Sequence, residues 1–132
     1  MATENKVIDL GLIADEDLSN DQYRIVVLDT TSVRVRRPNA ATDIPLGVLQ
    51  NAPAAAGDPA TVRPLGCGGT SKVQLGATLT GGAIIQCEYV SATDAGKAIS
   101  AVATGYPAGL LLSGGAEDEL AEVLLTPITV KA

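Results

Sequence analysis

A degenerate internal repeat constrains the fold of this chain more than any other feature of its sequence. Residues 44–65, IPLGVLQNAPAAAGDPATVRPL, return in altered form at residues 106–125, YPAGLLLSGGAEDELAEVLL. Each copy has the pattern of a strand that opens on Pro-x-Gly, a short Ala/Gly-rich connection, and a returning strand in which apolar and polar residues partly alternate. The aligned pairs include Pro45 with Pro107, Gly47 with Gly109, Ala60 with Ala121, and Val62 with Val123. We therefore predict two similar β-units in tandem.

Short apolar runs in the rest of the chain fit the same plan. Residues 23–28, YRIVVL, form a run of strand length that is rich in β-branched residues, and further runs follow it, separated by Gly and Pro. Strands spaced by roughly 8 to 12 residues are typical of a sandwich or a barrel. We expect one compact all-β domain over residues 22–132. Its core must be aliphatic, because the chain contains no Phe and no Trp.

The N-terminal segment, residues 1–21, has a different composition. Acidic residues are interspersed among its apolar residues, and turn residues are few. Such a segment can pair as a strand, or it can form an extended arm that orders only against a neighbour. We predict an acidic arm whose contacts with a partner come from four apolar side chains. These are Val7, Ile8, Leu10 and Leu12.

The same N-terminal segment lacks the features of a secretory signal, since no basic stretch precedes an uninterrupted apolar run. No apolar segment of the chain approaches the roughly 20 residues that are needed to cross a bilayer. We therefore expect synthesis in the cytoplasm and no membrane partner.

Charge argues against a nucleic-acid partner. Fifteen acidic residues against nine basic ones give a formal net charge of −6, which opposes binding to phosphates. The densest basic cluster consists of Arg34, Arg36 and Arg37. Period two places Arg34 and Arg36 on the face opposite the neighbouring valines. This cluster is either a solvated strand face or a docking patch for an acidic partner surface.

The residues that catalysis commonly uses are scarce. The chain has no His, so a Ser or Cys nucleophile lacks an imidazole base, and Cys67 and Cys87 lack partners for a zinc site. The two cysteines are either reduced thiols or a disulfide pair. The acidic run at residues 117–119 lacks the alternating spacing of a calcium loop. We expect no metal, no cofactor and no enzymatic activity.

Two resemblances emerge from these residues. The sequence IPLGVL at residues 44–49, the loop at residues 54–58, and the later glycine-containing segments at residues 81–82, 94–98 and 109–112 are similar to the small capsid decoration, or cement, proteins of tailed bacteriophages. The similarity covers roughly residues 22–125. A second and weaker resemblance is to lipoyl domains, whose hairpin tip carries a modified lysine; here two residues separate Asp94 from Lys97.

The resemblance to decoration proteins implies a viral structural protein. Such a protein binds the outer surface of the phage head and braces neighbouring subunits of the major capsid protein, often as a homotrimer. Each copy would then hold several subunits through contacts that must break together. Its partner contacts would be the N-terminal arm and the arginine cluster. The alternatives are another virion module, such as a tail or fibre base, and a lipoyl-like carrier domain modified at Lys97.

Overall fold

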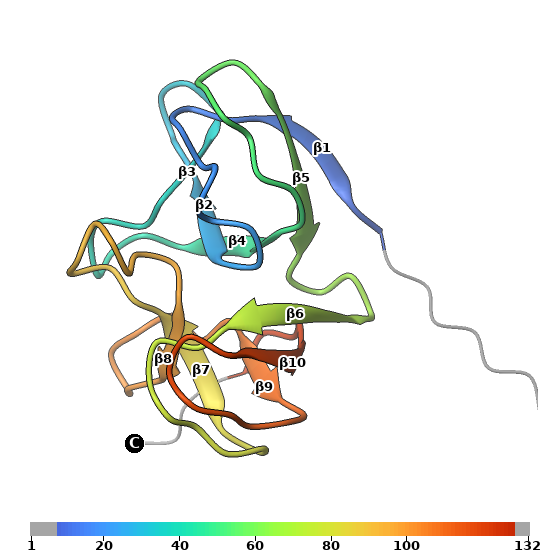
Figure 1. Ribbon diagram of the computed structural model, residues 1–132, viewed down its shortest axis with the longest axis vertical. Helices are drawn as coiled ribbons and strands as arrows, with labels where there is room; N and C mark the ends of the chain where they lie inside the picture. The colour runs from blue at the N-terminus through green and yellow to red at the C-terminus, as the bar shows by residue number, and fades with distance from the viewer. Residues whose placement is uncertain (1–7, 129–132) are drawn as a thin grey trace, which may run out of the picture.

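The computed structural model describes residues 8–128, and within these residues all regular structure is β-strand (Figure 1). Two five-stranded sheets form, each from a continuous part of the chain. The strands of the first sheet are β1 (Leu10–Ile13), β2 (Ile25–Leu28), β3 (Val35–Arg36), β4 (Pro45–Leu49) and β5 (Pro59–Pro64). Those of the second are β6 (Thr70–Gln74), β7 (Ile84–Cys87), β8 (Ala98–Ser100), β9 (Gly109–Leu111) and β10 (Leu120–Leu124). The predicted all-β fold is confirmed.

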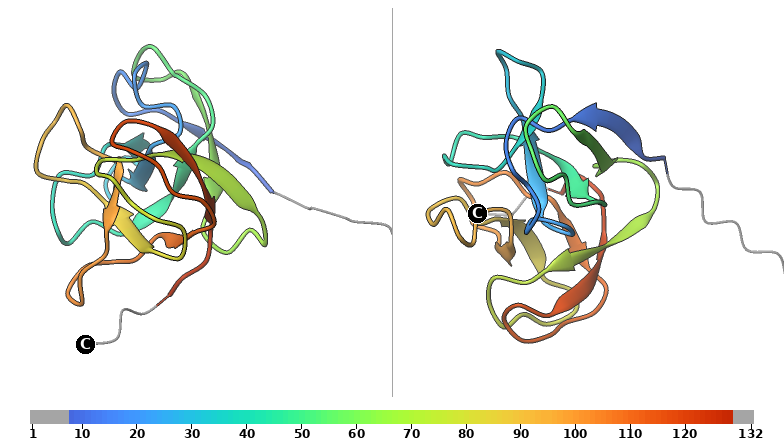
Figure 2. Two further views of the ribbon diagram at one scale, coloured as in Figure 1. Left: turned by 60° about the horizontal axis from the view of Figure 1, so that its bottom comes forward. Right: turned by 45° about the horizontal axis from the view of Figure 1, so that its top comes forward.

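The two sheets have the same topology. Strand order is β1-β5-β4-β2-β3 in the first sheet and β6-β10-β9-β7-β8 in the second, so each strand corresponds to the one five places later. We call residues 8–65 the first unit and residues 70–128 the second unit. Figure 1 and the right view of Figure 2 place the first unit above the second. The repeat seen in the sequence is therefore the β4–β5 and β9–β10 part of a longer structural duplication.

A single parallel bridge closes each sheet into a small barrel. In the first unit, Ala14 at the end of β1 bridges Val35 of β3, and the amide of Asp15 donates to the Val35 carbonyl at 2.8 Å. In the second unit, Leu75 bridges Ala98 in the same way, with a matching hydrogen bond at 2.8 Å. These bridges join the two edge strands of each sheet. Of the sandwich and the barrel that the sequence left open, the barrel is the form present, once in each unit.

The core is aliphatic, as the composition predicts. Val26, Leu49 and Val62 are buried inside the first barrel. Their counterparts in the second barrel are Ile85, Leu111 and Val123. Ile25 and Val48 alternate with the inward residues of the first unit and pack instead with the core of the second unit. The core of the second barrel therefore extends to β2 and β4 of the first unit, whereas the interior of the first barrel forms a separate cluster.

The N-terminal segment is described from Ile8 onward. Of the two forms that the sequence left open, strand pairing is the one adopted at Leu10–Ile13, because β1 pairs antiparallel with β5. Ala14 and Leu18, which follow β1, are fully buried in the core of the first unit. Val7, one of the predicted contact residues, lies outside the described residues. No helix that could cross a membrane occurs between residues 8 and 128.

Candidate functional site

Two of the three arginines in the predicted docking cluster hold the first unit together. The guanidinium of Arg36 donates to both carboxylate oxygens of Asp43, at 3.1 and 3.0 Å, and lies 3.4 Å from Asp29. Arg37 pairs with Glu16 at 2.7 Å and with Asp21 at 2.6 Å. Burial raises the pKa of Asp21, and Arg37 opposes this shift. Neither arginine is therefore a free charge at the surface.

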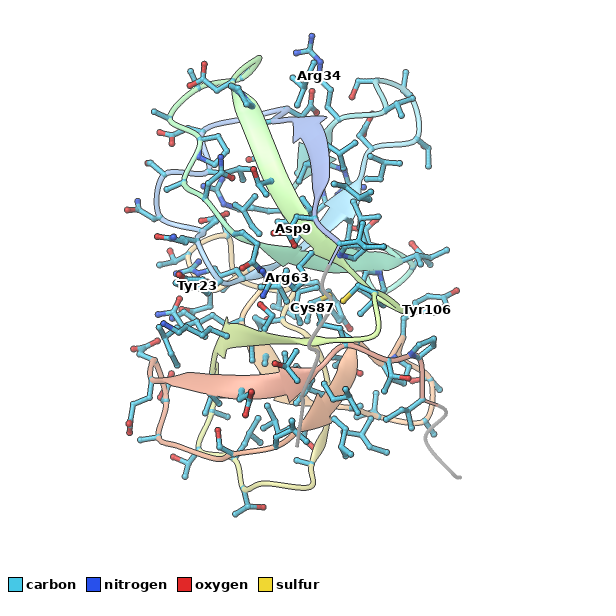
Figure 3. The ribbon with its side chains drawn as sticks, turned by 90° about the vertical axis from the view of Figure 1, so that its right-hand side faces the viewer. Asp9, Tyr23, Arg34, Arg63, Cys87 and Tyr106 are labelled. Atoms are coloured by element: carbon cyan, nitrogen blue, oxygen red, sulfur yellow. The ribbon has the colours of Figure 1, made fainter. Side chains whose placement is uncertain are left out.

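Arg34 differs from its two neighbours. No ion pair to Arg34 forms among residues 8–128. Its side chain lies at the end of the first unit that is remote from the second unit (Figure 3). Of the predicted basic cluster, Arg34 is the residue whose charge remains available to a partner.

The ion pair between Arg36 and Asp43 predicts a pH-dependent contribution to stability. Hydrogen bonds from Arg36, followed by those from the amides of Asn39 and Ala40, hold the pKa of Asp43 below its ordinary value. A carboxyl with a lowered pKa stabilises the fold above its unfolded value near 4 and loses that contribution as the pH falls further. We expect Asp43→Asn to lower the free energy of unfolding by about 1.5–3 kcal/mol at pH 7.

Chemical denaturation of both proteins between pH 7 and pH 2.5 measures this effect. The difference between wild type and Asp43→Asn should narrow as the pH falls below about 4. The pH dependence of Asp21 is common to both proteins and cancels in the comparison. Asp58→Asn is the matched control, since no ion pair to Asp58 forms within the described part of the chain. A constant difference at all pH values would contradict the assigned role of Asp43.

The predicted apolar contacts of the N-terminal segment divide into two kinds. Leu12 packs against the core of the first unit, so it is structural. Ile8 is 65 % exposed and Leu10 is 36 % exposed, and they lie before and at the start of edge strand β1. Ile8 and Leu10 therefore remain candidates for contact with a partner.

Lys97 is not presented at a hairpin tip, as a carrier domain requires. Its ammonium group donates to Asp94 at 2.6 Å and to Asp118 at 2.5 Å, and the residue is buried. The hydrogen bonds that Lys97 donates to Asp118 and then to Asp94 raise the pKa of Lys97. A lysine held in this way is neither accessible nor nucleophilic. This geometry argues against the carrier alternative.

Asp118 belongs to the acidic run at residues 117–119, which lacks the spacing of a calcium loop. Its pairing with Lys97 gives one member of the run a structural role. Within the described residues, no group of three or more His, Cys, Asp or Glu side chains is arranged to hold a metal ion. Cys67 and Cys87 are both free thiols, and burial raises the pKa of Cys87 to about 11.

An apolar groove between the two units is the surface that sequence analysis missed. It has a volume of about 270 Å³ and opens to solvent. No charged side chain lines it. The lining residues are Ile44, Pro45, Leu65, Tyr106, Pro107, Pro127 and Ile128. We call this surface the junction groove.

The two copies of the repeat build the junction groove together. Ile44 and Pro45 stand at the start of β4, and Tyr106 and Pro107 hold the equivalent position before β9. Ile44 is 67 % exposed and Tyr106 is 46 % exposed. A large apolar residue before Pro at both aligned positions was a signal in the sequence. Its exposure was not predictable, because it depends on how the two units pack.

The chemistry of the junction groove suits binding. An exposed aromatic ring and aliphatic side chains gain free energy when a partner covers them, because apolar surface leaves water. Tyr106 also offers a hydroxyl that can orient a partner. The groove, Arg34 and the exposed residues Ile8 and Leu10 are candidate contact surfaces.

Comparison with known proteins gives a fold likeness. No protein-family model matches the chain, and no curated protein matches it. Among solved structures, the chain is similar to the N base of head fiber gp8.5 in bacteriophage phi29, with a TM-score of 0.63 and 15 % sequence identity. The match covers 96 % of this chain and 100 % of that chain. At this identity, the likeness shows a shared fold across both units.

Proposed function

We propose that this chain is a structural protein of a bacteriophage virion that binds the outer surface of the head. The observation that carries the proposal is the fold likeness, which extends over 96 % of the chain to a protein solved as the N base of a phage head fiber. The resemblance of residues 22–125 to capsid decoration proteins was found independently, from sequence. Both comparisons concern proteins of the phage head.

The geometry of the surface supports a binding role. The junction groove exposes apolar side chains without any lining charge, which favours contact with an apolar segment of the major capsid protein. The chain has no His, and we propose no catalytic activity and no cofactor. Attachment through more than one surface would make detachment slow, since several contacts must break together.

Two forms of this function are distinguishable. In the first, the protein is a decoration or cement protein, a homotrimer that braces neighbouring major capsid subunits, as the sequence resemblance implies. In the second, it is the base of a head fibre, as the likeness to the phi29 protein suggests. A cement protein covers the shell at a fixed ratio to the major capsid subunit and stabilises it against heat. A fibre base carries a further fibre outward and need not change the stability of the shell.

Co-sedimentation with phage heads from the same source tests the proposal. We expect saturable binding of the purified protein to expanded heads, with weaker binding to unexpanded heads. The number of copies per major capsid subunit and the melting temperature of the decorated head then separate the two forms. Absence of binding to either kind of head would overturn the proposed function.

The junction groove predicts which substitutions weaken this binding. We expect Ile44→Ser combined with Tyr106→Ser to reduce affinity for heads roughly tenfold or more. Full burial of one large apolar side chain contributes about 1.5–3 kcal/mol, and these two partly exposed side chains can each lose a part of that. The control is Val102→Ser, since Val102 is 52 % exposed but does not line the groove. Equal binding of the double variant and wild type would remove the groove from the contact.

A further inference from the structure

The packing of the first unit on the second gives a template for a contact between copies. At this junction, Arg24 donates to the side chain of Gln74 at 2.9 Å, and Gln50 donates to Ser71 at 2.9 Å. The amide of Ile25 donates to the carbonyl of Gly96 at 2.7 Å. Figure 3 places Tyr23 and Arg63, which belong to the same face of the first unit, between the units. We call the contributing surface of the first unit a tail face and that of the second unit a head face.

The two units share one topology, so the first unit also has residues equivalent to the head face of the second unit. The second unit likewise has residues equivalent to the tail face of the first unit. The head face of the first unit is found from strand pairing. Leu10 pairs with Val62 as Ser71 pairs with Val123, and Ile13 pairs with Pro59 as Gln74 pairs with Leu120. Val33 corresponds to Gly96, since their amides donate at 2.9 Å to Asp29 and Glu88 respectively, and both residues have a positive φ. The head face of the first unit therefore consists of Leu10, Ile13 and Val33.

The tail face of the second unit follows from the same correspondence. The amides of Gln50 and Leu112 donate to the carbonyls of Thr61 and Glu122, at 2.7 and 2.8 Å. The carbonyls of Arg24 and Ala83 accept from Leu49 and Leu111, both at 2.9 Å. Ile84 matches Ile25, because each pairs with the equivalent residue of the next strand. The tail face of the second unit therefore consists of Ala83, Ile84 and Leu112.

Both of these faces are uncovered and apolar. Leu10 is 36 %, Ile13 46 % and Val33 63 % exposed on the head face. Leu112 is 49 % exposed on the tail face, where Ala83 and Ile84 are partly exposed. By contrast, the residues that meet at the internal junction include Arg24, Gln50, Ser71 and Gln74, which are polar.

Both free faces are apolar at positions where the two faces of the internal junction are polar. Where Gln50 meets Ser71 inside the molecule, the corresponding free residues are Leu112 and Leu10, both aliphatic. Where Arg24 meets Gln74, the corresponding residues are Ala83 and Ile13, again both apolar. Polar residues oppose polar residues within the chain, and apolar residues would oppose apolar residues between chains. Such matching across two distant surfaces is the complementarity expected of surfaces that bind each other.

Val33 and Gly96 have the same kind of backbone conformation at equivalent positions. The φ of Val33 is 58°, a left-handed conformation that is unfavourable for a β-branched residue. The equivalent position in the second unit is Gly96, which adopts φ 90° without that strain. Both residues belong to the turn that precedes β3 or β8, and in the first unit this turn presents a Val side chain that is 63 % exposed.

From these observations we propose that a second copy of this chain docks head-to-tail, with the tail face of one copy against the head face of the next. The contact resembles the internal junction but does not repeat it atom for atom. Inside the molecule, Gly96 has no side chain and lets its backbone approach Ile25. Between two copies, the equivalent Val33 brings a side chain to this contact. Val33 then packs against Ile84. The chain carries a net charge of −6, so two copies repel each other least where the contacting side chains are uncharged.

A head-to-tail contact leaves one free face of each kind at the ends of a chain of copies. It produces a closed ring if the rotation between copies closes and a linear filament if it does not. Arg34, next to Val33, lies at the end of the first unit remote from the junction (Figure 3), so this part of the head face is clear of the second unit. The inference concerns the isolated protein and does not require the proposed function.

Two blocked variants test the proposal through the mass of the particles in solution. Val33→Asp blocks the head face and Leu112→Asp blocks the tail face, and both side chains are exposed, so the fold is retained. Sedimentation velocity over a wide concentration range should show self-association of wild type, weakened at least tenfold in each variant. An equimolar mixture of the two variants should form a dimer that grows no further, since each supplies the face that the other lacks.

Val90→Asp is the matched control, because Val90 is 82 % exposed and belongs to neither face, and it should associate like wild type. The proposal is overturned if wild type is monomeric at every concentration, or if neither variant changes its association. It is also overturned if the mixture stays monomeric, because the contact would then not be head-to-tail. Monomeric wild type combined with reduced binding of Val33→Asp to phage heads would assign the head face to the shell protein instead.

Discussion

Replacing Gly47 with alanine is expected to destabilise the protein by about 3 kcal/mol or more, a large fraction of the roughly 5–15 kcal/mol by which a domain is stable. A Cβ at Gly47 would collide with the carbonyl of Arg63 and with Pro64 in the paired strand β5. The obstruction is backbone, so a change of rotamer cannot relieve it. Urea denaturation followed by circular dichroism measures the loss.

Gly11→Ala is the control for Gly47→Ala. Gly11 lies in β1 and nothing stands within 4 Å of the position that its Cβ would occupy. Alanine there should leave stability unchanged or raise it by about 0.4–1 kcal/mol, because the unfolded chain loses freedom. Gly109→Ala should behave like Gly47→Ala, since a Cβ at Gly109 would collide with Leu124. Stability of Gly47→Ala close to that of wild type would refute the close approach of β4 and β5.

Truncation of Leu111 to alanine is the second substitution with a large expected effect. Leu111 is 1 % exposed, and removal of three buried carbon atoms lowers the free energy of unfolding by about 2–5 kcal/mol. Because Ile25 and Val48 of the first unit pack in the same cluster, we expect the loss to appear in one cooperative transition.

Leu49→Ala provides the matched comparison, because Leu49 occupies the equivalent place in the first unit and is fully buried. Both variants should shift the whole unfolding curve, whether it is followed by calorimetry or by the signal of the tyrosines. Two separate transitions, of which each substitution moves only one, would show that the barrels unfold independently. The shared cluster would then contribute little to their coupling.

The arginine cluster shows the limit of the local sequence pattern. The sequence identifies Arg34, Arg36 and Arg37 as the densest positive charge. It does not reveal that Asp43 and Asp21 pair with two of them, because those carboxylates come from separate connections of the first unit. Which charges pair depends on where the connecting loops place the carboxylates in the folded chain. Of the three arginines that the sequence offered as a docking patch, only Arg34 has a charge that remains available to a partner.

The repeat shows the same limit on a larger scale. The β4–β5 and β9–β10 segments are recognisable because both copies need Gly at a close backbone approach and small or branched residues inside a narrow barrel. The segments β1 to β3 and β6 to β8 correspond just as closely in hydrogen bonding, yet their similarity is absent from the sequence. Leu10 and Ser71 occupy one structural position with opposite polarity.

What the sequence by itself determined is therefore the part of the molecule that depends on local chemistry. Alternating apolar residues, Gly and Pro establish the strands and turns, and the absence of Phe and Trp makes the core aliphatic. The tertiary structure alone decided which surfaces of the two units are covered and which remain free. Ser71 faces the first unit whereas Leu10 faces solvent, because only the second unit has a neighbour packed on that side. Exposure is a property of the packed chain, so the junction groove and the two free faces appear only once the barrels are placed together.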